Sequence, residues 1–103
     1  MIQVRNKDKE SNFIILCDHA SNKIPSKFNN LGLSKDILNT HIAYDIGSKE
    51  VAIKLSSILD CPLVMSDFSR LLIDPNRGID DPTLIMKISD NIKIKGNLRV
   101  KNF

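Results

Sequence analysis

Tryptophan is absent from this 103-residue sequence, and aromatic residues make up only 5% of it. The longest apolar run, residues 13–17, is far too short to cross a membrane, so we expect no membrane partner. The start of the chain lacks the basic and then apolar pattern of a secretory signal peptide. The two cysteines form no CxxC pair, and the sequence therefore predicts reduced thiols and a cytoplasmic location.

Only four glycines are present, and they are dispersed, so the sequence contains neither a phosphate-binding glycine loop nor a nucleophile elbow. The net charge is +3, but the basic residues are interleaved with acidic ones. A nucleic-acid-binding protein would gather lysine and arginine on one face, often with aromatic residues between them. We therefore expect no nucleic-acid partner. The 42% hydrophobic and 26% charged content is typical of a globular domain.

Short apolar segments alternate with polar ones along the chain. Residues 1–12 form a polar leader, within which residues 1–4 alternate as a strand does. Residues 13–17 form an unbroken run of apolar residues rich in strand formers. This run predicts a strand that is buried on both faces, as in a parallel sheet. It ends abruptly at Asp18, where a polar loop begins.

The clearest helix is predicted for residues 45–59, where apolar residues recur at helical spacing. Ser34 is a good cap for a shorter helix that runs to about residue 39. Three further segments are a strand at 62–66, an apolar segment at 68–73, and one or two helical turns at 84–88. The order of strand, loop, helix and strand predicts a βαβ unit in an α/β sheet. Ligands of such sheets bind at the carboxyl ends of the strands.

His19 lies at that position, directly after the first buried strand. Its imidazole could bind a metal through one nitrogen, while a carboxylate or carbonyl group fixes the other. The alternative is that His19 forms hydrogen bonds with the loop backbone. His41 and Asp45 share one face only if the helix already includes residue 41. Asp45 could alternatively cap the helix that follows it.

Arg70, Asp74, Asn76 and Arg77 form a third polar group. Two arginines and an amide can hold a substrate carboxylate. The alternative is a surface ion pair between Arg70 and Asp74, followed by an ordinary turn.

Three segments in order resemble successive N-terminal motifs of the N-formylglutamate amidohydrolase-like family. They are CDHASNKIP at residues 17–25, HIAYDIG at 41–47 and SRLLIDPNR at 69–77. The segment DDPTLI at 80–85 is similar to the stretch that follows them in the family. The resemblance covers roughly residues 13–97, and it relates the chain to zinc carboxypeptidase and deacylase-type hydrolases.

The resemblance implies a fold and a site. The fold is α/β, a partial three-layer α/β/α arrangement around a mixed, mostly parallel sheet, with residues 13–103 as the N-terminal portion of the domain. Zinc is the implied cofactor, with His19 and Asp45 as ligands, since Asn22 stands where some relatives have a ligating glutamate. The implied substrate is a small N-acylated acidic amino acid, and the residues expected to hold its carboxylates are Arg70, Asn76 and Arg77.

The implied reaction is the zinc-dependent hydrolysis of N-formyl-L-glutamate to formate and L-glutamate. Family members also use a further histidine ligand and a catalytic glutamate. No histidine follows His41 here, and the only glutamates are Glu10 and Glu50. We therefore expect a truncated fragment that contains no catalytic base and is inactive alone, with a second chain as a possible source of the missing half. The alternative is a folded remnant without catalysis, or a binding module.

Overall fold

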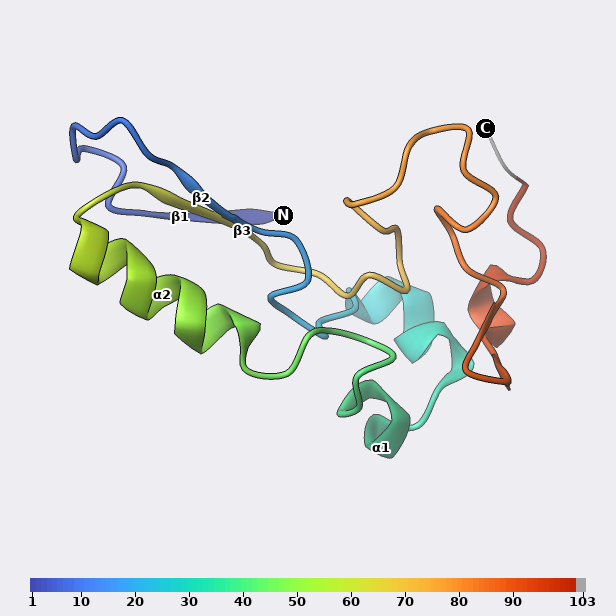
Figure 1. The fold of residues 1–103 in the computed structure, drawn as a ribbon. Coiled ribbons are helices and arrows are strands. Elements are labelled where there is room, and N and C mark those ends of the chain that lie inside the picture. Colours follow the sequence, from blue (N-terminus) through green and yellow to red (C-terminus); the bar gives the residue numbers. More distant parts are fainter. Residues whose placement is uncertain (102–103) are drawn as a thin grey trace.

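Three strands and one long helix form one half of the molecule (Figure 1). The computed structural model describes residues 1–101. Strands β1 (Ile2–Arg5), β2 (Ile15–Cys17) and β3 (Leu63–Ser66) form a sheet in the order β1-β3-β2. Strand β3 is antiparallel to β1 and parallel to β2. The mixed sheet and the predicted βαβ unit are confirmed, because helix α2 (Ser48–Leu59) connects β2 to β3 and packs against both.

The other half of the molecule has little regular structure. Beside the sheet lie the short elements η1 (Ser26–Gly32), α1 (Lys35–Leu38), β4 (Ile88–Ser89), β5 (Ile92–Lys93) and η2 (Lys95–Asn97). Helix α1 is capped as predicted, since the Ser34 hydroxyl accepts a hydrogen bond from the backbone N–H of Ile37 at 3.3 Å. The helical turns predicted for residues 84–88 are wrong, because residue 88 instead opens the small β4–β5 hairpin.

Two predictions about the βαβ unit need correction. The first strand is not buried on both faces: β2 is shorter than the apolar run 13–17, and Leu16 is 67% exposed. In the described residues β2 pairs with β3 only, so it lies at an edge of the sheet. The main helix begins at Ser48 rather than at residue 45, because Gly47 supplies the left-handed cap at φ 86°.

Each half of the molecule has its own apolar cluster. One lies between the sheet and α2 and contains Ala20, Ala52, Leu63 and Met65. The other fills the irregular half and contains Leu31, Leu33, Leu38, Ile42, Ala43, Leu71 and Ile94. Ser69 ties its segment to two others by hydrogen bonds. Its hydroxyl donates to the backbone carbonyl of Ala43 at 2.8 Å, and its backbone N–H donates to the backbone carbonyl of Lys23 at 2.7 Å. The apolar segment at 68–73 is therefore a buried connection that forms turns, not a strand.

Candidate functional site

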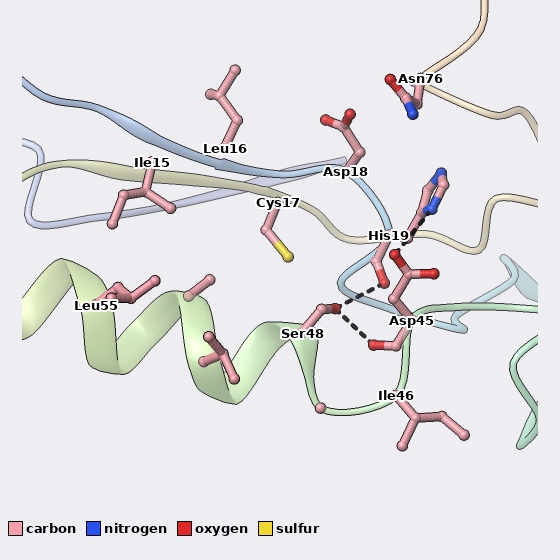
Figure 2. Close-up of a pocket in the computed structure, with 13 residues that line it drawn as sticks. Ile15, Leu16, Cys17, Asp18, His19, Asp45, Ile46, Ser48, Leu55 and Asn76 are labelled. Carbon is pink, nitrogen blue, oxygen red and sulfur yellow. Dashed lines mark hydrogen bonds and ion pairs between the residues drawn. The ribbon is translucent and has the colours of Figure 1, made fainter.

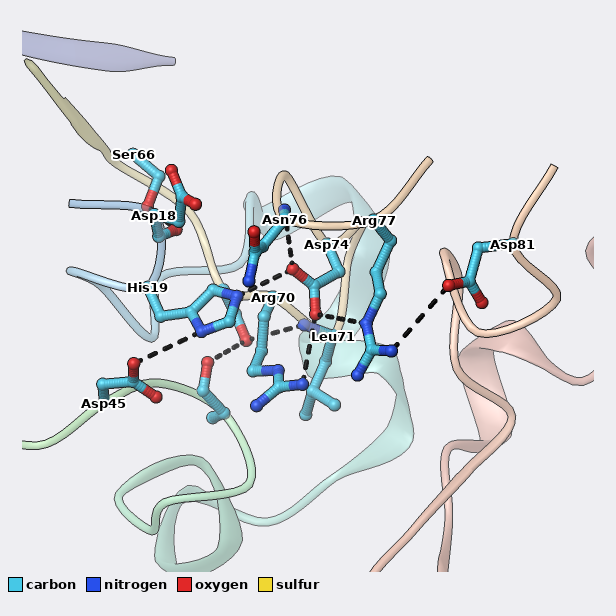
Figure 3. Close-up of polar contacts among 12 residues, drawn as sticks. Asp18, His19, Asp45, Ser66, Arg70, Leu71, Asp74, Asn76, Arg77 and Asp81 are labelled. Carbon is cyan, nitrogen blue, oxygen red and sulfur yellow. Dashed lines mark hydrogen bonds and ion pairs between the residues drawn. The ribbon is translucent and has the colours of Figure 1, made fainter. Parts of the chain in front are cut away.

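His19 lies between two carboxylates at the carboxyl end of β2 (Figure 3). Its Nε2 is 2.7 Å from Oδ1 of Asp74, and its Nδ1 is 3.4 Å from Oδ2 of Asp45. The imidazole is 10% exposed, so its orientation is set by these groups rather than by solvent. Functional residues were expected at the carboxyl end of this strand. The residue found there is His19, and each of its two ring nitrogens faces a carboxylate.

Asp74 is the buried member of this group, with no exposed side-chain surface. Its Oδ1 also accepts a hydrogen bond from the backbone N–H of Asn76 at 3.0 Å, and its Oδ2 is 3.1 Å from Nη2 of Arg70. Burial by itself would raise the pKa of Asp74. The hydrogen bonds from His19 and Asn76, with the electrostatic influence of the nearby His19 and Arg70 side chains, outweigh burial and lower that pKa.

Because Asp74 is ionised and can only accept, Nε2 of His19 carries the proton of this short hydrogen bond. The Nδ1 atom is then left to bind a cation or a second proton. Two ligands of one tetrahedral zinc ion, at about 2.0–2.1 Å from it, lie roughly 3.3 Å apart. The 3.4 Å between Nδ1 and the Asp45 carboxylate fits this separation, and it is long for a hydrogen bond. A carboxylate that orients a ligating histidine from behind is a common feature of zinc sites.

Asp45 is held in place through its backbone, which leaves its carboxylate free. Its N–H donates to the carbonyl of His19 at 3.0 Å, and its own carbonyl accepts from the Ser48 hydroxyl at 2.7 Å. The side chain is 58% exposed. Asp45 does not cap α2, since that position belongs to Gly47. The backbone contacts therefore place an accessible carboxylate beside Nδ1 of His19.

Asn76 and Arg77 follow Asp74 on the same loop. Asn76 is exposed and lies over His19, on the side of the ring where Asp18 also stands (Figures 2 and 3). Arg77 is only partly covered, with its Nε 3.7 Å from Oδ2 of Asp74 and its Nη1 3.8 Å from Oδ2 of Asp81. Asn76 lines the groove at His19, whereas Arg77 lines a separate pocket on the other side of Asp74.

Arg70 is more constrained than the sequence suggested. The ion pair with Asp74 exists, but it is buried rather than on the surface. The contact between Arg70 and Asp74 does not have the geometry of a hydrogen bond. Among the described residues, Nε of Arg70 and Oδ2 of Asp74 are both buried without a hydrogen-bond partner. The guanidinium group therefore neutralises Asp74 at close range.

Two residues from the sequence argument lie outside this group. His41 is an exposed side chain whose Nε2 is 3.6 Å from Oδ2 of Asp90, and residues 41–45 form turns rather than a helix. The helix through residue 41 that would place His41 and Asp45 on one face is therefore absent from the described residues. The amide of Asn22 donates to the carbonyl of Leu38 at 2.7 Å and so joins its loop to α1.

An apolar groove of about 600 Å³ leads away from His19 and Asp45 (Figure 2). It runs between β2 and the neighbouring side of α2, where Ile15, Leu16, Val51 and Leu55 line it.

Within residues 1–101, no group of three or more histidine, cysteine, aspartate or glutamate side chains could hold a metal ion. In the same part of the chain, no helix is long and apolar enough to cross a membrane.

The part played by Asp74 was missed from the sequence, where it was read as a possible surface partner of Arg70. A usable signal was present: Asp74 ends an apolar segment, as Asp18 and His19 end another, and polar residues at such ends can meet. The sequence separation of 55 residues between His19 and Asp74 hid the contact.

Comparison with known proteins gives a family match and a structural match. The profile of the N-formylglutamate amidohydrolase family matches residues 11–102. The crystal structure of a gene product of Agrobacterium tumefaciens is similar over 97% of this chain, with a TM-score of 0.94 and 37% identity. The chain spans 40% of the length of that protein. No match was found among curated proteins. The family profile and the similarity to this structure together show that the chain belongs to the N-formylglutamate amidohydrolase family.

Proposed function

We propose that this chain contributes part of a zinc site that hydrolyses a small N-acylated acidic amino acid, with N-formyl-L-glutamate as the substrate and formate and L-glutamate as the products. The family assignment supports the class of reaction. The observation that carries the proposal is the position of His19, with one nitrogen against buried Asp74 and the other beside accessible Asp45.

In this proposal His19 and Asp45 are the two protein ligands that the chain offers to zinc. When bound, zinc would supply a water of lowered pKa and would polarise the amide carbonyl. Asp74 would hold the proton on Nε2, so that Nδ1 presents its lone pair on the side of the ring where Asp45 lies. The buried carboxylate also keeps the imidazole from rotating, which fixes the direction in which it would bind.

Asn76, Arg77 and Arg70 are the proposed contacts of the substrate carboxylates. Asn76 offers an exposed amide, and Arg77 offers a partly exposed guanidinium group that forms long ion pairs with Asp74 at 3.7 Å and with Asp81 at 3.8 Å. An arginine with a free edge can bind a carboxylate through two parallel hydrogen bonds. Arg70 would assist through its charge, because its Nη2 already lies against Asp74.

Catalytic zinc usually has three protein ligands, whereas His19 and Asp45 are two. We therefore propose that the chain alone binds zinc weakly and does not turn over substrate. The further ligand, the catalytic base and the remaining layer of the three-layer α/β/α fold would come from the part of the domain that residues 1–103 do not include. A folded module that binds without catalysis is the alternative, and a cytoplasmic location fits the two free cysteines.

Calorimetric titration with zinc tests this proposal. We expect heat of binding for the unaltered chain, and its loss in the His19→Ala variant. His41→Ala is the matched control, because His41 is exposed and lies beside Asp90, away from the site. Equal heats for the unaltered chain and His19→Ala would contradict the zinc proposal. Hydrolysis of N-formylglutamate by the purified chain at ordinary enzymatic rates would contradict the proposed need for a further part.

A further inference from the structure

The hydroxyl of Ser48 lies between the backbones of the two proposed zinc ligands (Figure 2). Its Oγ donates to the carbonyl oxygen of Asp45 at 2.7 Å and lies 3.3 Å from the carbonyl oxygen of His19. A hydroxyl has a single proton, so the shorter contact is the principal hydrogen bond and the longer one is its weaker branch. The side chain of Ser48 therefore joins the segment after β2 to the turn that precedes α2.

This use of a serine hydroxyl is not the usual one at the start of a helix. A serine in such a place commonly accepts a hydrogen bond from a free backbone N–H of the first turn. In α2 the cap residue is Gly47, and within the described residues no side-chain hydrogen bond caps this helix. The Ser48 hydroxyl instead donates backward to carbonyl groups that precede the helix. Capping of α2 therefore does not account for the hydroxyl.

Asp45 depends on such contacts, because it belongs to no helix or strand. Its backbone N–H donates to the carbonyl of His19 at 3.0 Å. Its carbonyl accepts from the backbone N–H of Ser48 at 3.1 Å, as well as from the hydroxyl. The carboxylate of Asp45 is mostly exposed, so surrounding side chains do little to fix it. Its position beside Nδ1 of His19 therefore follows from where the two backbones are held.

The spacing of these two side chains matters for a metal site. Nδ1 of His19 and Oδ2 of Asp45 are 3.4 Å apart, which is close to the separation of two ligands on one zinc ion. Binding groups must be held within about 0.5 Å of their working positions by neighbours that support them. Asp74 gives this support to the ring of His19. Ser48 has the corresponding place behind Asp45, since its hydroxyl is bonded to the carbonyl of that residue.

We infer that Ser48 is a positioning residue for the metal site: its hydroxyl holds the backbones of His19 and Asp45 at the spacing that lets one zinc ion bind both side chains. The inference rests on the proposed function for the identity of the ion. In this role Ser48 acts through the two ligands and does not itself bind zinc. Removal of a group that orients metal ligands typically weakens metal affinity by about 10- to 100-fold.

Calorimetric zinc titration of serine variants of the full chain tests this role. We expect Ser48→Ala to bind zinc at least about tenfold more weakly than the unaltered chain. Ser48→Thr keeps a hydroxyl at the same position and should restore most of the affinity. Ser57→Ala is the matched control, because it makes the same substitution at an exposed position of the same helix, and it should bind as the unaltered chain does. Equal affinities for Ser48→Ala and the unaltered chain would overturn the inference, as would an equal loss in Ser48→Ala and Ser48→Thr.

Amide hydrogen exchange in the metal-free chain separates positioning from a general loss of structure. Without the hydroxyl, the Asp45 amide that donates to His19 should exchange roughly two- to tenfold faster, as the loss of one hydrogen bond predicts. The amides of residues 52–59 in α2 should keep their rates, because alanine forms helices at least as well as serine does. Equal acceleration of both groups would show that Ser48 stabilises the helix rather than the ligand pair, and the inference would be wrong.

The same measurements distinguish this inference from the zinc proposal. If the unaltered chain takes up no zinc, the zinc proposal fails, and the exchange rate of the Asp45 amide alone decides whether Ser48 holds the pair. If zinc binds with an affinity that depends on His19 but not on Ser48, the zinc proposal stands and the positioning role is refuted.

Discussion

Replacing Asp74 by asparagine is expected to lower the free energy of unfolding at pH 7 by about 3 kcal/mol. The change preserves size and one acceptor oxygen, but it removes the charge that faces His19 and Arg70. A hydrogen bond to a charged group contributes about 1.5–3 kcal/mol, and breaking a buried ion pair costs about 3–5 kcal/mol. The retained oxygen offsets part of that sum. The total free energy of unfolding of a small domain is only about 5–15 kcal/mol, so a loss of this size is large.

Urea unfolding, followed by circular dichroism, measures this difference. Asp45→Asn is the control, because its carboxylate is mostly exposed and lies 3.4 Å from the same imidazole. An exposed ion pair contributes about 0–1 kcal/mol, so the control should change stability little. If Asp74→Asn and Asp45→Asn have the same effect, below about 0.5 kcal/mol, then the buried group does not stabilise the fold and the physical account of the site is wrong.

The pH dependence provides an independent check on the same residue. The pKa of Asp74 in the folded chain lies below its ordinary value. A group of this kind stabilises the fold above its unfolded pKa of about 3.9, and the stabilisation is lost as pH falls through the folded pKa. The difference between the unaltered chain and Asp74→Asn should therefore be full at pH 7 and should shrink only below about pH 4. A difference that stays constant to pH 3 would refute this.

Two predictions concern the irregular half of the chain. A methyl group added at Gly96 would stand 2.7 Å from Cα of Leu31, so Gly96→Ala should lower the unfolding free energy by roughly 1–3 kcal/mol in thermal melts, whereas Gly78→Ala, with nothing within 4 Å, should change it little. Ser34→Ala should cost about 1 kcal/mol through loss of the cap of α1, and an unchanged melting temperature would show that this cap is not needed.

The elements with a strong local signal were predictable. The spacing of apolar residues located α2, and the hydroxyl of Ser34 located α1, because both signals lie within a few residues of the structure they cause. The exact start of α2 was not predictable from apolar spacing, since it depends on the left-handed backbone of Gly47. The hairpin that replaces the predicted helix turns at Asp90 and Asn91, whose φ angles are 49° and 64°, and apolar periodicity does not record such a turn.

The candidate site was predicted only where local sequence segments mark its residues. His19, Asn76 and Arg77 occur in recognisable segments, and the structure brings these segments together. The contact between His19 and Asp74 joins residues 55 positions apart, and only the folded chain shows that the carboxylate is buried and that Arg70 serves it. The exposed edge at β2 was unexpected because an apolar run predicts burial without saying which chain supplies the cover.

Asp74, Asn76 and Arg77 belong to a stretch of chain with scarcely any helix or strand of its own. Its order must come from contacts with other segments, and the bond from Asp74 to His19 is one of them. Local opening of this stretch would therefore dismantle the site without unfolding the sheet. Any ligand that binds the assembled site must, by mass action, also suppress that opening. Resistance of residues 76–101 to proteolysis would then indicate whether a ligand occupies the site at His19 and Asp45.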